Sequence, residues 1–177
     1  MNNFDKNWGN AKTDIFRLEG RPEYKIPKEE GNAAKGSFVD PNMMGSAKDR
    51  QKWAAALTSA KKRGVKVRRV RVVPSPVPDY IRREIEIWRG NPANNGEELF
   101  FIETADYNEI IAGCGFNLKD FWLFDNDKLL ILNYSPAGLF TGDIPIADGG
   151  MVKRYCELKQ KLLKKAVPLE KFPQKKS

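Results

Sequence analysis

The sequence has no histidine among its 177 residues. This absence excludes the Ser-His-Asp and Cys-His catalytic arrangements, histidine zinc sites, and the paired histidines of phospholipase D-type phosphodiesterases. Catalysis would then depend on carboxylates, lysine, tyrosine, cysteine or a metal ion held by oxygen atoms. The sequence therefore favours a protein that is not an enzyme, and it predicts no cofactor.

Cysteine and long apolar runs are also scarce. The two cysteines, Cys114 and Cys156, lie far apart and without CxxC spacing, which indicates neither a disulfide framework nor a zinc cluster. The N-terminus lacks the apolar core of a signal peptide, and no run approaches the roughly 20 apolar residues that cross a bilayer. These features predict a cytoplasmic protein with no membrane partner.

The composition is 41% hydrophobic and 31% charged, which is typical of a folded chain, and the length suits one domain. Residues 1–45 are rich in Asn, Gly, Pro and Lys, without a sustained hydrophobic period. We expect an irregular N-terminal arm over 1–45, an α/β domain over 46–168 and a basic C-terminal tail over 169–177.

Hydrophobic periodicity predicts the elements of the α/β domain. Helices are expected at 46–64, 79–88, 104–111 and 148–167, and strands at 65–73, 98–103, 120–125, 128–134 and 139–142. The strand at 65–73 either contains a bulge or shows a basic residue to each face near Arg68 and Arg69. The fold class is α/β, a mixed sheet flanked by helices, with a parallel pair at 65–73 and 98–103.

Several segments resemble, in the same order, an uncharacterised bacterial family, domain of unknown function 6879. They are Phe16–Glu19, Glu23–Pro27, Arg69–Val73, Asp79–Glu84, Gly96–Glu98, Asp120–Asp125 and Tyr134–Gly138. The resemblance spans roughly residues 16–170. Members of that family are best known from actinobacteria and are often encoded beside helix-turn-helix regulators, which implies a regulatory role and a protein partner of that kind.

A looser similarity connects the segment that begins Gly64-Val65-Lys66-Val67-Arg68, with a helix on either side, to a phospholipase D-like half-domain. In that half-domain too, a strand pair ends in an Asp at a turn, and Asp125 has this place in the present sequence. The catalytic His-x-Lys of that fold has no counterpart in this chain. The similarity therefore implies a non-catalytic descendant.

The net charge of +8 is unevenly distributed along the chain. Residues 48–71 contain ten basic residues against one acid, and residues 153–177 contain nine against two. Residues 97–148 contain ten acids against two lysines. One interpretation is a basic face that binds nucleic acid or an acidic partner, because phosphates favour clustered lysine and arginine. The other is a solvated surface that the acidic centre neutralises.

The first interpretation assigns anion binding to six residues: Arg68, Arg69, Arg71, Tyr80, Arg82 and Arg83. Arg82 and Arg83 also lie three and four positions after Asp79, within reach of a structural ion pair on the same helix. The leading hypothesis is thus a non-enzymatic binding or regulatory module whose basic face is made by the helix at 46–64, the strand at 65–73 and the helix at 148–167.

Two alternatives stay open. Glu84, Asp120 and Asp125 could hold a metal ion in a phosphodiesterase or nuclease, provided that the three carboxylates converge. Asp125 could instead serve only the hairpin turn that it begins. The second alternative is a protein-interaction subunit that pairs with a helix-turn-helix regulator through an apolar patch.

Overall fold

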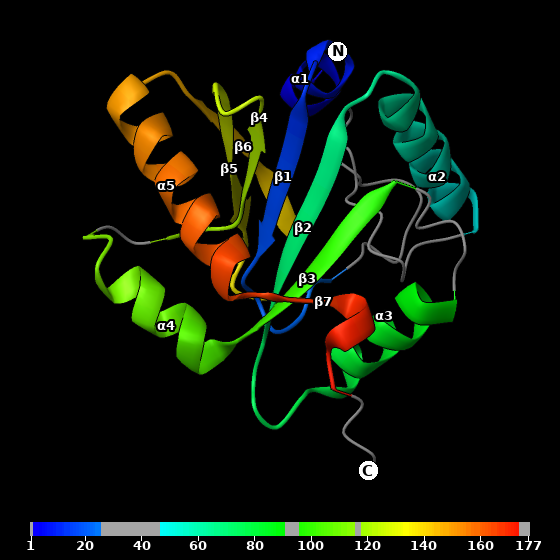
Figure 1. Ribbon diagram of the computed structural model, residues 1–177, viewed down its shortest axis with the longest axis vertical. Helices are drawn as coiled ribbons and strands as arrows, with labels where there is room; N and C mark the ends of the chain where they lie inside the picture. Colours follow the sequence, from blue (N-terminus) through cyan, green and yellow to red (C-terminus); the bar gives the residue numbers. More distant parts are fainter. Residues whose placement is uncertain (1, 26–46, 91–95, 116–117, 174–177) are drawn as a thin grey trace.

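Parallel strands lie at the centre of one mixed sheet in the computed structural model, which describes residues 2–25, 47–90, 96–115 and 118–173. The seven strands of the described residues are ordered β6-β5-β4-β1-β2-β3-β7 (Figure 1). Strands β1 (Asp14–Glu19), β2 (Lys66–Val73) and β3 (Glu97–Glu103) run parallel. Strands β4 (Phe121–Phe124), β5 (Lys128–Tyr134) and β6 (Phe140–Ile146) extend the sheet antiparallel beyond β1, and β7 (Val167–Pro168) pairs antiparallel with β3.

Helices cover both faces of this sheet. The helices are α1 (Asn3–Asn10), α2 (Ala47–Lys62), α3 (Asp79–Gly90), α4 (Thr104–Ala112) and α5 (Gly149–Lys165), with a short 3₁₀ turn η1 (Leu169–Lys171). Helices α4 and α5 pack on one face, here called the α5 face, and α1, α2 and α3 pack on the other, the α2 face (Figure 1). The predicted α/β class and the parallel pair β2 and β3 are confirmed.

The alternation of side chains along β1 and β2 decides what each face contains. On the α5 face, Phe16, Leu18 and Val70 pack against Leu158 and Leu162 of α5. On the α2 face, apolar residues form two separate clusters, one around Trp53 of α2 and one around α3. Strand β2 pairs in continuous register on both sides, so it has no bulge within its pairing and shows Arg68 and Arg69 to opposite faces.

The predicted irregular arm is wrong for the N-terminal part that the structure describes. Residues 3–10 form α1, and 14–19 form β1, the strand between β4 and β2, with all six residues buried. The charged residues Arg17 and Glu19 interrupt the apolar run of β1, so the sequence pattern does not predict this strand. Most of the predicted loose segment at 28–45 lies outside the described residues. The expected C-terminal tail begins with η1, where Leu169 is buried.

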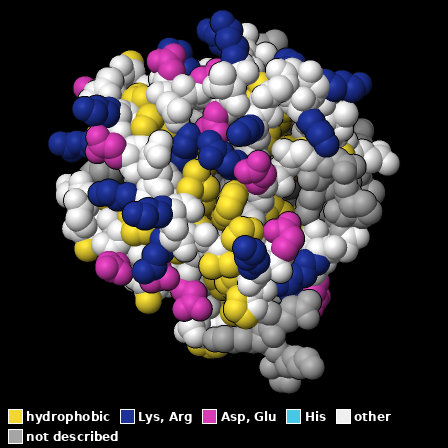
Figure 2. Space-filling view, viewed as in Figure 1, with side chains coloured by type: hydrophobic (Ala, Val, Ile, Leu, Met, Phe, Trp, Pro, Cys, Tyr) yellow, Lys and Arg dark blue, Asp and Glu magenta, His cyan; other side chains and the backbone are white. Residues whose placement is uncertain are grey.

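Exposed basic residues occur over both faces. On α5, Figure 2 shows Lys and Arg side chains along the helix. The exposed basic residues of α5 are Lys153, Arg154, Lys161, Lys164 and Lys165. Helix α2 carries another set, Arg50, Lys52, Lys61 and Lys62, on the opposite side of the sheet. The two basic helices therefore do not form one shared surface. None of the helices that the structure describes is long and apolar enough to cross a membrane.

Candidate functional site

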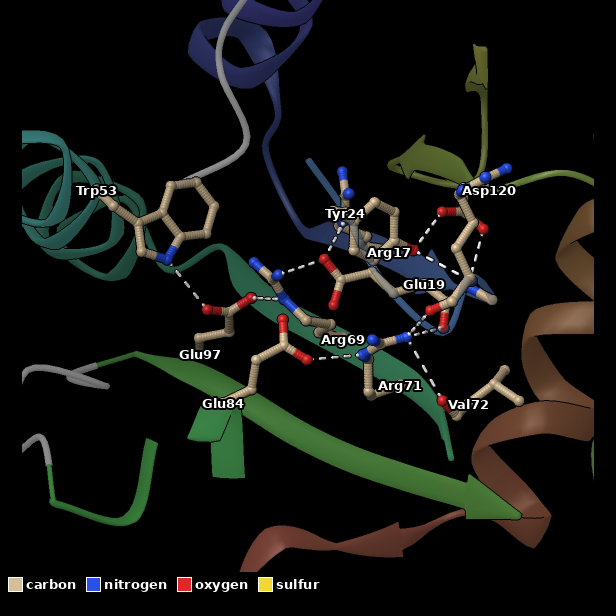
Figure 3. A network of polar contacts seen from close by, with 12 residues as sticks. Arg17, Glu19, Tyr24, Trp53, Arg69, Arg71, Val72, Glu84, Glu97 and Asp120 are labelled. Carbon is tan, nitrogen blue, oxygen red and sulfur yellow. Dashed lines mark hydrogen bonds and ion pairs between the residues drawn. The ribbon is translucent and has the colours of Figure 1, made fainter. Parts of the chain in front are cut away.

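A network of buried charges separates the two apolar clusters of the α2 face. The parallel register of β1 and β2 places Arg17 beside Arg69 and Glu19 beside Arg71. All four side chains are at most 2% exposed. Charged groups buried to this extent are stable only when they are paired and hydrogen-bonded. The contacts drawn in Figure 3 show how these groups are paired.

Arg69 lies at the centre of the network. Its Nη1 lies 2.6 Å from Glu19 Oε1, and its Nε lies 2.7 Å from Glu97 Oε1. Trp53 of α2 donates its indole N–H to Glu97 Oε2 at 3.1 Å, and Arg17 donates to Glu19 Oε1 at 3.0 Å. Ion pairs thus join the three parallel strands, and a hydrogen bond from Trp53 connects them to α2 (Figure 3).

Arg71 connects the network to α3 and to the chain that follows β1. Its Nε donates to Glu84 Oε2 of α3 at 3.0 Å. Its Nη1 donates to the backbone carbonyl of Arg21, and its Nη2 donates to that of Pro22 at 3.4 Å. The guanidinium also lies 5.3 Å from the ring of Tyr24. Arg71 therefore positions the turn that leaves the carboxyl end of β1.

Among the described residues, the network contains one more acid than base. It has three arginines, Arg17, Arg69 and Arg71, and four acids, Glu19, Glu84, Glu97 and Asp120. Burial raises the pKa of Glu84 to about 7, although Arg71 acts in the opposite direction. Burial also raises the pKa of Asp120. Glu84 Oε1 is buried and has no hydrogen-bond partner among the described residues.

The six residues predicted to bind an anion do not come together. Arg69 and Arg71 were expected at a surface, and this is wrong, because the α2 face to which they point is covered by helices and supplies glutamate partners. Arg68 points to the α5 face, is 24% exposed and pairs with Asp14.

The other three predicted residues lie on α3, over the α2 face. Tyr80 is half-buried, and Arg82 and Arg83 are exposed. Arg82 Nη2 lies 3.2 Å from Asp79 Oδ1, which is the structural ion pair that the spacing allowed.

The proposed carboxylate metal site is also wrong, because its members lie apart. Asp125 accepts hydrogen bonds from the backbone N–H groups of Lys12, Thr13 and Asp14, before and at the start of β1. Asp120 accepts one from Gly20, after the end of β1. Because β1 is six residues long, these points are separated by about 20 Å. The described residues contain no group of three or more Asp, Glu or Cys side chains that could hold a metal ion.

Asp125 instead has the turn role that was its alternative. Both Asp125 and Asn126 have positive φ, 51° and 56°, in the three-residue turn between the paired Phe124 and Lys128. Asp and Asn tolerate this left-handed conformation. Burial raises the pKa of Asp125. Hydrogen bonds from the backbone N–H groups of Asp14, Lys12 and Thr13 act more strongly in the other direction and lower this pKa to about 2. This carboxylate connects the hairpin to the start of β1.

A cleft of about 310 Å³ opens at the other end of β1. Its lining residues are Gly20, Arg21, Tyr107, Leu118, Lys119, Asp120, Leu132, Asn133 and Tyr134. Asp120 is buried and accepts hydrogen bonds from Gly20 N at 2.8 Å and from the Tyr24 hydroxyl. A Cβ atom at Gly20 would lie 3.2 Å from Asp120 Oδ1, so glycine permits this close approach. No pattern in the sequence predicts this cleft, because its lining residues come from separate segments of the chain.

The model of the family described as "Domain of unknown function (DUF6879)" matches residues 2–174. The chain belongs to this family. The match covers α1 and β1 as well as the part first expected to fold, so the whole sheet is within the DUF6879 domain. No curated protein matches the chain. The similarity to a phospholipase D-like half-domain stays a prediction.

Proposed function

We propose that this DUF6879 protein is a non-enzymatic binding or regulatory module that binds nucleic acid through the exposed side of α5. The supporting observation is the charge of that side. Lys153, Arg154, Lys161 and Lys164 are exposed there, and Glu157 is the exposed acid among them. At 100° per residue these five side chains lie within about 100° of the helix circumference. We call the four basic residues the α5 basic face.

The α5 basic face has the length of a short nucleic-acid contact. From Lys153 to Lys164 the helix rises about 16 Å, which equals the span of about five phosphates on one strand of B-DNA. Lys165, at the C-terminal end, instead pairs with Asp106 of α4 at 3.1 Å. Lys66 of β2 is exposed and adds positive charge on the same side of the sheet, whereas Arg68 is paired with Asp14.

Helix α2 supports the proposal less well. Its cations cluster near the two ends of the helix. Arg63, which follows the helix, is used by the fold itself, since it donates to the Trp8 carbonyl at 2.8 Å and to Ser59 Oγ at 3.2 Å. The α2 side therefore offers a control surface of similar charge.

The proposal is tested by titrating the protein with labelled DNA and RNA at several salt concentrations. We expect binding that weakens steeply with salt. The double variant Lys161→Gln/Lys164→Gln should lower affinity about tenfold or more and reduce the log–log salt slope by about 2, because two phosphate contacts are lost. The control variant Lys61→Gln/Lys62→Gln removes the same charge from α2 and should leave the slope unchanged. Equal losses in both variants, or no binding at low salt, would contradict the proposal.

A protein partner such as a helix-turn-helix regulator is the second candidate, favoured by the edge strand β6. In and beside this strand, Ile144 is 48% and Leu139 38% exposed. An edge strand also offers unpaired backbone groups to another chain. If Ile144→Ser abolishes partner binding while the nucleic-acid titrations stay unchanged, β6 is the partner surface. If Ile144→Ser binds the partner with unchanged affinity, this candidate fails.

A further inference from the structure

The cleft at the end of β1 occupies a special position in the sheet. From β1 the chain adds β2 and then β3 on one side, and it later adds β4 on the other side of β1. The chain order therefore changes direction between β1 and β4. In open α/β sheets, ligands bind outside the carboxyl ends of the parallel strands. Strand β1 is such a strand, and β4, which is antiparallel to it, brings its amino end to the same place. Gly20 and Arg21 follow β1, and Lys119 and Asp120 precede β4, so the cleft lies at this point.

The lining of the cleft is rich in hydrogen-bond donors. Arg21 is half-buried, and its guanidinium lies 5.5 Å from the ring of Tyr134. Arg21 Nε is buried and has no hydrogen-bond partner among the described residues. A ligand in the cleft cannot reach this buried atom, so the group that Arg21 offers is the accessible part of its half-buried guanidinium. Lys119, which is exposed, adds a second cation and lies 2.9 Å from Asn133 Oδ1.

Asp120, the acid in the lining of the cleft, already has partners within the fold. Its oxygens already accept hydrogen bonds from Gly20 and Tyr24, and the positive charge of Arg17 lies near it. Burial raises its pKa, which favours the uncharged form relative to an ordinary aspartate. Asp120 thus joins the end of β1 to the start of β4, and the charge offered to a ligand comes from Arg21 and Lys119.

We propose that this cleft binds a small hydroxylated oxyanion, such as a sugar phosphate or a sugar acid. Arg21 and Lys119 hold the phosphate or carboxylate group, since guanidinium and ammonium groups form strong hydrogen bonds to such oxygens. Tyr107, Asn133 and Tyr134 supply hydroxyl and amide groups for ligand hydroxyls. The volume of about 310 Å³ equals about ten water molecules, which suits a small metabolite.

The test is a calorimetric titration of the full chain with three ligands: glucose 6-phosphate, gluconate and uncharged glucose. We expect the phosphate or the carboxylate to bind with a dissociation constant of about 1 mM or lower and glucose to bind at least tenfold more weakly. The stronger of the two oxyanions identifies the head group. Failure of both oxyanions to bind, or binding of glucose as tight as theirs, overturns the proposal.

Variants then locate the binding. Arg21→Gln should weaken oxyanion binding tenfold to about a hundredfold, because a charge-assisted hydrogen bond is lost. The matched control is Arg82→Gln on α3, exposed and outside the cleft, which should bind as the parent does. Because Arg21→Gln could disturb the turn after β1, the exposed Lys119→Gln variant is measured as well and should weaken binding three- to tenfold. Unchanged affinity in both cleft variants overturns the proposal.

Discussion

On the α5 face of the sheet, β1 and β2 present mainly phenylalanine, leucine and valine to the apolar side of α5, with Asp14 paired to Arg68 and Lys159 at one end. On the α2 face the same two strands present arginine and glutamate. The α5 face is stabilised by burial of apolar area, which is non-directional. The α2 face depends on ion pairs, each of which requires particular partners. Buried ion pairs contribute little net stability, because desolvation offsets their attraction. The comparison shows that arginines on a strand can belong to the interior of the protein.

Removing one member of the charge network tests most directly whether the α2 face depends on its ion pairs. Arg69→Met should lower the free energy of unfolding by about 3–5 kcal/mol, because Glu19 and Glu97 lose a partner that is buried with them. Urea denaturation measures the loss. Arg82→Met, which removes an exposed guanidinium on α3, should cost less than about 1 kcal/mol. Similar losses for the two variants would mean that Arg69 is not a buried ion-pair member.

The titration of Glu84 predicts a second, smaller change in the free energy of unfolding. Because the pKa of Glu84 is raised to about 7 in the fold from an ordinary value of 4.5, its stabilising effect is complete below pH 4.5. It is lost as the pH rises through 7. The stability of the parent relative to Glu84→Gln should therefore fall between pH 5 and pH 8, by on the order of 1–3 kcal/mol.

The Glu84 prediction is measured by chemical denaturation of both proteins across this range. Taking the difference cancels the titration of groups common to both. A difference that is constant with pH, or that rises, would contradict the raised pKa of Glu84.

Asp125 lies outside the network, and its contribution to the free energy of unfolding should change with pH in the opposite direction. We expect this effect to be the smallest of the three. Its pKa is lowered to about 2, so its contribution is present above the ordinary value of 3.8 and is lost as the pH falls through 2. Asp125→Asn keeps an acceptor and tolerates positive φ, so we expect a loss of less than about 1 kcal/mol at pH 7. The difference between the two proteins should shrink toward pH 2 in thermal unfolding experiments. A growing difference would contradict this sign.

Much of the fold could be predicted from the sequence, because β2, β3 and α5 follow clear periods and the hairpin at 125–126 has clear turn residues. Strand β1 could not be predicted, because Arg17 and Glu19 resemble surface residues when their buried partners are not known. The alternation in β2 was correctly identified, but the sequence gives no sign of which face is covered. One signal was available: Glu84 lies on the apolar stripe of Ile81, Ile85 and Trp88, so it was bound to be buried and to need a cation.

The cleft was beyond sequence reasoning for a different reason. Its lining residues come from the end of β1, from α4, from the approach to β4 and from the end of β5. These segments meet only because β4 pairs with β1 and not with β3. The order of strands in a sheet depends on the packing of the whole chain, so it cannot be predicted from the periodicity of one segment.

The hydrogen bonds that hold the two ends of β1 affect when the sheet can form during translation. Its start is held by Asp125 and its end by Asp120, residues 100 to 113 positions later in the chain. A ribosome that adds about 5–20 residues per second takes about 5–20 s to reach them. During that interval the N-terminal strand has emerged without the hairpin that fixes both its ends. Completion of the sheet is thus timed by the synthesis of a segment in the second half of the protein.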